Sequence, residues 1–266
     1  MPGRLLDLIN ATLRGMPSIL MTCSIGLGLH MLWLKRYQLA KLQVSEADQL
    51  FGHMLIIGGV ILAPVAFGAE WSQRLDWTII LLGIACSCWG LGFFRMNPLP
   101  VFLIAIGLIP EPFRLGQALW EAFLPPLMLE RLMAWGGNLG LRAIGQPATL
   151  EDTIIALPGG TVDVRWGCNG FDMAVTMGVA SLLLGLFLKQ SMLKVVGMVT
   201  VGVVLALLFN VPRIMLLALS EAYWGRATFD FWHGMWGGQI FSGVLFTVYY
   251  YVVMALIKQR SSKSVA

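Results

Sequence analysis

The sequence predicts an all-α integral membrane bundle of about eight transmembrane helices, with one small β-hairpin outside the lipid. Of its 266 residues, 58% are apolar and only 12% are charged, whereas soluble domains have about 45 to 50% and about 25%. Eight spans of about 20 residues would take about 160 residues, which is close to the apolar share of the chain. A mean hydropathy of +0.77 agrees with this class and excludes a water-soluble globule.

Apolar runs that could cross a bilayer recur along the chain, each bounded by charge, Pro or Gly. The eight candidate spans are Met16–Leu34 and residues 53–69, 77–94, 99–115, 119–141, 168–188, 193–209 and 233–257. The run at 119–141 is the least hydrophobic of them, so seven spans is the alternative count. We expect one multi-span domain over residues 1–266, with N-terminal spans in 1–118, a catalytic part in 119–257 and a basic cytoplasmic tail in 258–266.

Residues 145–164 interrupt this apolar pattern. Two strand-like runs, 153–157 and 161–164, flank the turn signal Pro158-Gly159-Gly160, which predicts a β-hairpin. Unpaired strand edges are not tolerated against hydrocarbon, so the hairpin must lie in water or against the bundle. It leads the chain directly to Cys168.

The charge pattern limits the partners of the chain. Lys and Arg number 18 against 14 Asp and Glu, a net charge of +4. The basic residues are spread between apolar runs and form no basic face, which argues against nucleic acid as a partner. The lipid bilayer is the expected partner instead.

Three chemically reactive side chains fall at one membrane boundary. Cys168 opens a span that descends to Lys189, the next span rises from Lys194 to Arg213, and His233 opens the last span. Counting spans therefore places a thiol, a guanidinium and an imidazole on the same face. Ionisable groups are expensive in such an apolar background unless they have a function or a partner.

This combination suits nucleophilic catalysis on an amide bond. An imidazole or a nearby positive charge favours the reactive thiolate, so Cys168 and His233 could form an ion pair. The planar donors of Arg213 could hold the oxyanion of a tetrahedral intermediate, and charged His233 could protonate the leaving amine. This chemistry needs no cofactor and no metal. The isolated cysteines Cys23, Cys86 and Cys88 are expected to serve packing.

Three short motifs resemble the signature blocks of the exosortase and archaeosortase family: Cys168-Asn169-Gly170, then Asn210-Val211-Pro212-Arg213, then His233 followed by Gly237. The resemblance covers roughly residues 119–257, and Asn169 departs from the Ser or Thr of many members, as in the cyanobacterial branch. It implies a membrane cysteine protease or transpeptidase that cleaves C-terminal sorting tails of exported proteins. Such a tail has a Pro-Glu-Pro type motif, a membrane helix and a basic end. The resemblance further implies Cys168 as nucleophile, Arg213 as oxyanion or thiolate stabiliser and His233 as acid and base.

Further polar residues are candidates for supporting roles. Asp172 follows Cys168 by four residues, so on a helix it would share a face with the thiol and orient the imidazole or pair with Arg213. Arg165 and Arg226 are candidates for binding the carboxylate of a sorting motif. The supporting positions, taken together, are Asn169, Gly170, Asp172, Asn210 and Gly237.

The positive-inside rule orients the site, because Lys and Arg favour cytoplasmic loops. Five basic residues stand on one side, against Arg165 and Arg226 on the other; the five are Lys189, Lys194, Lys258, Arg260 and Lys263. The active site should therefore face away from the cytoplasm, in the plasma or inner membrane. Eight spans would place Lys35, Arg36 and Lys41 outside, whereas seven would place them inside, so the N-terminal orientation stays open.

Two other classes of function remain as alternatives. In a transporter or channel, Arg213 and Asp172 would line a polar path through the bilayer. In a structural membrane subunit, Cys168 would be inert. The absence of an internal repeat disfavours the transporter, since many transporters are built from two related halves.

Overall fold

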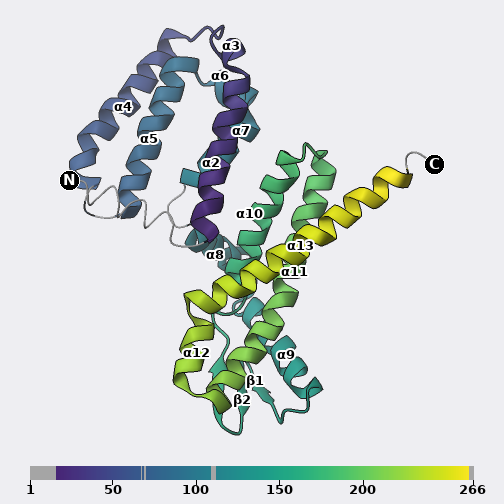
Figure 1. Ribbon diagram of the computed structural model, residues 1–266. Helices are drawn as coiled ribbons and strands as arrows, with labels where there is room; N and C mark the ends of the chain where they lie inside the picture. Colours follow the sequence, from purple (N-terminus) through teal and green to yellow (C-terminus); the bar gives the residue numbers. More distant parts are fainter. Residues whose placement is uncertain (1–15, 67, 69, 109–111, 264–266) are drawn as a thin grey trace. The chain divides into compact units, whose positions relative to one another are not determined.

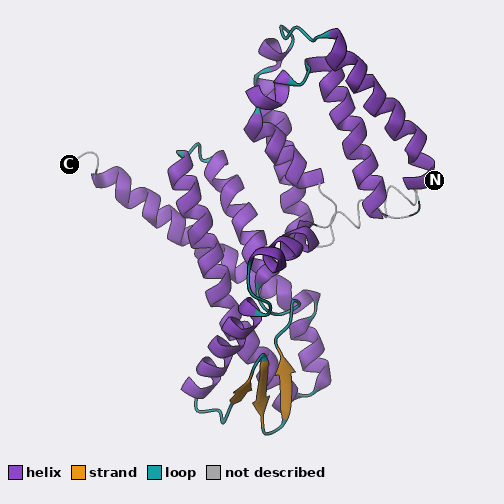
Figure 2. Cartoon of the chain, turned by 180° about the vertical axis from the view of Figure 1, so that it is seen from behind, coloured by secondary structure: helices purple, strands orange, loops and turns teal. Residues whose placement is uncertain are grey.

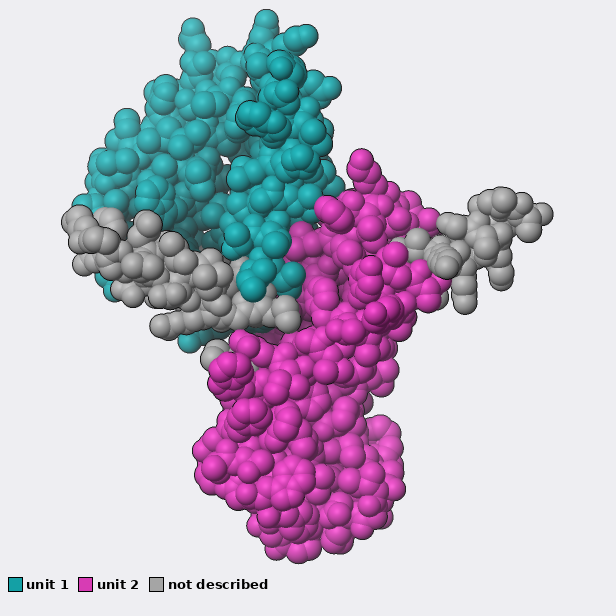
Figure 3. Space-filling model, in the orientation of Figure 1, with its two compact units in different colours: residues 1–118 teal, residues 119–266 magenta. Residues whose placement is uncertain are grey.

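The computed structural model describes residues 16–66, 68, 70–108 and 112–263 (Figure 1). Contacts divide the chain into two compact units, residues 1–118 and residues 119–266 (Figure 3). The candidate site residues all lie in the second unit.

The described part of the first unit is helical. Helix α2 (Met16–Leu34) packs against α7 (Pro98–Leu108), and α4 (Glu46–Ala66) packs against α5 (Glu70–Trp89), with short helices α3 (Arg36–Leu39) and α6 (Gly92–Met96) between them. The backbones of α4 and α5 approach closely at Gly52, where a Cβ atom would lie 2.5 Å from the Ser87 nitrogen. Small residues at such contacts are typical of helix packing in membranes.

The second unit combines long helices with a small sheet. After α8 (Pro112–Phe123), which crosses the unit boundary, α9 (Met128–Ala143) leads to strands β1 (Thr149–Glu151), β2 (Ile154–Leu157) and β3 (Gly160–Asp163). Helices α10 (Phe171–Phe187) and α11 (Met192–Leu219) form an antiparallel pair (Figure 1). A π-helical turn, η1 (Ser220–Trp224), then leads to α12 (Arg226–His233) and α13 (Met235–Lys263).

The predicted hairpin forms between β2 and β3, with Ile155 opposite Val162 and Leu157 opposite Gly160 (Figure 2). A third strand, β1, extends it on the other side and pairs Leu150 with Ile155. Strand β1 was not predicted, because three residues, Thr149–Glu151, are too few to show an alternating pattern.

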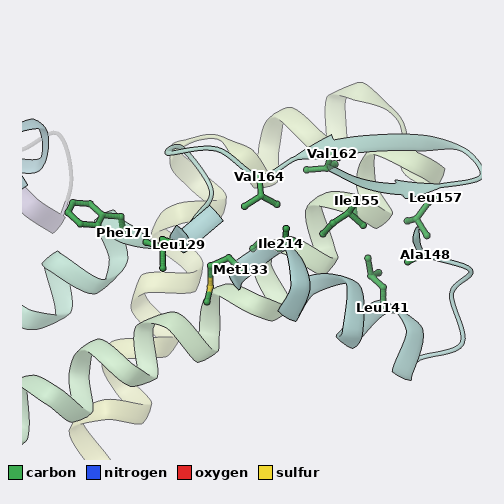
Figure 4. Close-up of a cluster of buried hydrophobic side chains, with 12 residues drawn as sticks. Leu129, Met133, Leu141, Ala148, Ile155, Leu157, Val162, Val164, Phe171 and Ile214 are labelled. Atoms are coloured by element: carbon green, nitrogen blue, oxygen red, sulfur yellow. The ribbon is translucent and has the colours of Figure 1, made fainter. Parts of the chain in front are cut away.

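The sheet and two helices enclose the core of the second unit. Leu141 of α9, Ile155 of β2, Val164 after β3 and Ile214 of α11 are fully buried in one cluster (Figure 4). Phe171, the first residue of α10, belongs to the same cluster. Because β3 and the start of α10 are both fixed to this core, the segment between them, which carries Cys168, is held at both ends.

The structure confirms a mostly helical chain with candidate membrane spans, but it does not confirm eight of them. Among the described residues, three helices are long and apolar enough to cross a membrane: Glu46–Ala66, Met192–Trp224 and Trp236–Ala255. A fourth results if Pro98–Leu108 and Phe113–Phe123 form one broken span. Ile19–Leu34 and Phe171–Phe187 are shorter apolar helices.

The predicted span at 119–141 is wrong as a single helix. Helix α8 ends at Phe123 and α9 begins at Met128, with Leu127 in a left-handed conformation between them (φ 58°). Pro125 and Pro126 explain the break, since proline lacks the N–H of the helical ladder and restricts the residue before it. Helix α9 packs against the sheet and α11 instead.

The predicted span at 193–209 is too short. Helix α11 continues through Pro212 to Leu219, because the proline removes one donor from the ladder without ending the helix. Arg213 therefore lies within α11 rather than at its end. The prediction that His233 opens the last span is also wrong, because His233 is the last residue of the short helix α12.

Candidate active site

The site begins with the loop between β3 and α10. Cys168 is only 5% exposed, and its N–H donates to the Arg165 carbonyl at 2.8 Å. The Cys168 carbonyl accepts a 2.8 Å hydrogen bond from Nδ2 of Asn210, 42 residues later on α11. The backbone on both sides of the thiol is therefore fixed, once by its own turn and once by a distant helix.

Asn169 connects this loop to two further elements. Its Oδ1 accepts from the N–H of Phe171 at 3.0 Å, which satisfies a free donor at the start of α10. Its Nδ2 donates at 3.0 Å to Oε1 of Glu130 in the first turn of α9. Asn169 is fully buried, so both bonds are shielded from water.

Gly170 completes the loop with a left-handed backbone, φ +82°. A Cβ atom at this position would lie 2.8 Å from Cγ of Asn210. Both the dihedral angle and the contact therefore favour glycine. Each residue of the Cys-Asn-Gly motif thus makes a different contact in the structure. Cys168 and Gly170 both contact Asn210.

Arg213 follows Asn210 by three residues, so the two side chains share one face of α11. Arg213 is 7% exposed and Asn210 is fully buried. Within the described part of the chain, Nε of Arg213 and Oδ1 of Asn210 are buried without a hydrogen-bond partner. The Arg213 charge interacts with Cys168 and with Asp172. Buried polar groups are nearly always paired, so these two unpaired atoms are unusual features of the site.

His233 reaches the same place from α12. Its ring stacks on Phe229, with centroids 5.3 Å apart. Its Nε2 lies 3.7 Å from the position that a Cβ atom of Gly167 would occupy, directly before Cys168. The structure therefore brings Cys168, Arg213 and His233 together from a loop, a long helix and a short helix.

The electrostatics favour a neutral resting pair. Burial raises the pKa of the Cys168 thiol, although the Arg165 backbone N–H and the Arg213 charge oppose this. Partial burial and the charge of Arg213 lower the pKa of His233, against the opposing effect of Asp230. At neutral pH the resting site then holds a thiol and an uncharged imidazole. The ion pair suggested by the sequence would form only when the proton passes to His233.

The remaining predicted residues lie around this centre. Asp172 is exposed on α10 and interacts with the Arg213 charge. A Cβ atom at Gly237 would collide with the backbone of Trp232, so this glycine allows α13 to pack on α12. Arg165 pairs with Asp163 at 2.6 Å, and Arg226 with Asp230 at 3.1 Å. Both arginines are mostly exposed. Arg165 lies in the loop that carries Cys168, and Arg226 is the first residue of α12.

Sequence reasoning missed Glu130, which is 1% exposed and bonded to Asn169. Its acidic side chain inside a run assigned to the membrane was a usable signal, because an ionisable residue in such a run is a functional candidate by default. Among the residues that the structure describes, no three His, Cys, Asp or Glu side chains are grouped to hold a metal ion.

A helical membrane protein with a buried thiol, a guanidinium and an imidazole at one site defines a narrow class. The model of the transmembrane exosortase family matches residues 19–250. The chain belongs to this family. The match begins at residue 19, 100 residues before residue 119, where the three motifs' resemblance began, and so includes most of the first unit. No curated protein and no solved structure matches the chain.

Proposed function

We propose that the chain is a membrane-embedded cysteine peptidase or transpeptidase that cleaves C-terminal sorting tails of exported proteins. The observation that carries the proposal is the convergence of Cys168, Arg213 and His233 around one loop. Asn210 holds this loop through a hydrogen bond to the Cys168 carbonyl. A loop fixed on both sides of a buried thiol suits a nucleophile, which must meet its target in one orientation.

The chemistry follows from the neutral resting pair. The Cys168 thiol passes its proton to a ring nitrogen of His233, and the sulfur attacks the amide carbonyl carbon to form a C–S bond. Arg213 holds the oxyanion. As the C–N bond breaks, His233 returns the proton to the leaving amine, and a thioester remains on Cys168. Water, or an amine acceptor in the transferase case, then releases the acyl group.

The length of α11 supports a site at the membrane surface. Arg213 lies 21 residues after Met192, the first residue of α11, or about 32 Å along a helix. The hydrocarbon layer is about 30 Å thick. A helix that enters the lipid near Met192 thus brings Arg213 to the opposite boundary, and the residues beyond it pack on the sheet outside.

The same reasoning gives the orientation. Lys189 and Lys194 flank the turn between α10 and α11, at the end of these helices remote from Cys168. Basic residues favour the cytoplasm, so the site faces away from it, in a multi-pass protein of the cell membrane. A substrate tail with its own membrane helix and basic end would bring a bond to this depth, and Arg165 or Arg226 would meet the carboxylate of its motif.

The proposal is tested with an exported reporter that carries such a tail. Cells that express the wild-type chain should trim the reporter, and Cys168→Ala should abolish trimming while the protein still inserts, because no other group can form the thioester. Cys88→Ala, at an exposed cysteine outside the site, is the control and should trim normally. Trimming by Cys168→Ala would refute the mechanism.

A further inference from the structure

Glu130 is a buried acid for which the proposed reaction has no use. It lies in the first turn of α9, is 1% exposed, and accepts a hydrogen bond from Asn169 at 3.0 Å. Burying a carboxylate is costly unless hydrogen bonds compensate. Burial of Glu130 therefore costs folding free energy, and the residue that hydrogen-bonds to it is Asn169, next to Cys168.

The bond has a fixed direction. The N–H of Phe171 must donate to the oxygen of the Asn169 amide, so the NH₂ group of that amide points to Glu130. Without the Glu130 acceptor, this buried NH₂ group would lose its partner, at a considerable cost. The amide could recover the bond only by rotating or by moving the loop.

Movement of this loop would displace the thiol. Cys168 is held from the other side by Asn210 of α11, and α9 and α11 pack closely, since a Cβ atom at Gly137 would lie 2.6 Å from Ile214. Two packed helices thus hold the Cys168-Asn169 pair between them, one through the Cys168 carbonyl and the other through the Asn169 amide.

Resting on the proposed function, we propose that Glu130 is a positioning residue of the active site, which holds the Cys168 nucleophile in its attacking orientation through the side chain of Asn169. Glu130 touches no reacting atom. Its role is to keep the loop in the arrangement in which the Cys168 carbonyl meets Asn210 and the thiol lies within reach of the Arg213 charge.

The charge of Glu130 supplies a second, independent signature. The charged side chains that act on the thiol are Asp163 at the end of β3, Glu130 on α9 and Arg213 on α11. The two carboxylates raise the pKa of Cys168, whereas Arg213 and the Arg165 backbone N–H lower it. Glu130→Gln removes one of these negative charges but keeps an oxygen that can accept from Asn169. This variant should therefore separate the effect of the hydrogen bond on the position of Cys168 from the effect of the Glu130 charge on the thiol.

The test uses the full chain in detergent micelles, with Cys23, Cys86 and Cys88 replaced by Ala so that iodoacetamide reports on Cys168. Steady-state cleavage of a peptide tail gives kcat and KM. Glu130→Ala should lower kcat on the order of 100-fold, the expected cost of a misplaced catalytic group, with little change in KM. Glu130→Gln should recover most of kcat and shift the midpoint of Cys168 alkylation to lower pH. Glu151→Gln, at an exposed acid of β1, is the matched control and should change neither quantity.

A double-mutant cycle tests the route of the effect. Since Glu130 acts through Asn169, Glu130→Ala combined with Asn169→Ala should be no slower than the slower single variant. A wild-type kcat for Glu130→Ala would overturn the proposal, as would fully additive losses in the cycle. If the wild-type chain fails to cleave any tail, the proposed function fails instead. Glu130 is then judged by alkylation alone, and an unmoved midpoint in Glu130→Gln would refute its action on the thiol loop.

Discussion

At the scale of single residues, two asparagines organise the loop that carries Cys168. Asn210 binds the Cys168 carbonyl and crowds Gly170, while Asn169 joins the start of α10 to Glu130. The spacing of the three motifs indicated which residues belong to the site, but not these bonds. A hydrogen bond between residues 130 and 169 depends on how α9 packs, and local sequence patterns do not contain that information.

Arg213→Lys tests the guanidinium. A lysine keeps the positive charge but loses the forked donors, and the Nε of Arg213 makes no hydrogen bond within the described structure. We expect kcat to fall on the order of 100-fold to 1000-fold, as when an oxyanion donor is removed. Cleavage kinetics would show this. A Lys variant with nearly normal kcat would mean that charge alone suffices.

The pH dependence of cleavage tests the resting pair. The His233 pKa is lowered, so the imidazole stays uncharged, and able to accept the thiol proton, to pH values below its usual 6.5. The Cys168 pKa is raised, so the thiol loses its proton to solvent only at a pH above the usual pKa of a cysteine. The kcat/KM profile should therefore have an acid limb below pH about 6.5 and a late alkaline limb.

Asp230→Asn should move the acid limb to still lower pH. The Asp230 carboxylate raises the pKa of His233, whereas Arg226 and Arg213 lower it, and the substitution leaves Arg226 without its 3.1 Å partner. Asp152→Asn is the matched control, because Asp152 is also exposed and bonded to an arginine, Arg131. An acid limb that moves to higher pH, or moves equally in both variants, would contradict this assignment.

At the scale of elements, the short helices decide where the site residues lie. Hydropathy identified the long apolar runs, and the hairpin could be predicted from Pro158-Gly159-Gly160 between two strand-like runs. Pro125 and Pro126 also indicate a helix break in the sequence, but the prediction of a span at 119–141 followed the apolar character of the run instead. The short helix α12 was not predictable in this way, because its eight residues are too few to show a clear period.

Gly237→Ala tests the placement of His233 by α12. A Cβ atom at Gly237 would collide with the Trp232 backbone, whereas one at Gly238 would meet nothing within 4 Å. We expect Gly237→Ala to push α12 away and lower kcat strongly, with the iodoacetamide reactivity of Cys168 unchanged. Gly238→Ala, the neighbouring control, should cleave like the wild type. Equal activity of the two variants would show that the contact does not position the imidazole.

At the scale of the whole chain, the second unit contains two hydrophobic cores. Tyr249 and Leu245 of α13 are buried against Met177 of α10 and Ala206 of α11, in a core of helices alone. The other core, with Ile155 and Val164, contains the sheet, whose strand edges require water or protein around them. Arg213 lies on α11 and Cys168 directly precedes α10, and both helices contribute residues to the two cores. The span count predicts that this junction lies at a membrane boundary.

This location predicts that membrane confinement, more than the motif itself, brings substrate to the site. A tail helix restricts the scissile bond to the depth of Cys168 and replaces a search in three dimensions by diffusion in a plane, which raises the effective concentration. In vesicles that contain the wild-type chain, a reporter with motif, helix and basic end should be cleaved far faster than the same reporter with the helix deleted. The reporter with the helix kept and the motif acid replaced should lie between them. Both rates should vanish in Cys168→Ala, and equal rates with and without the helix would show that the site recruits its substrate from solution.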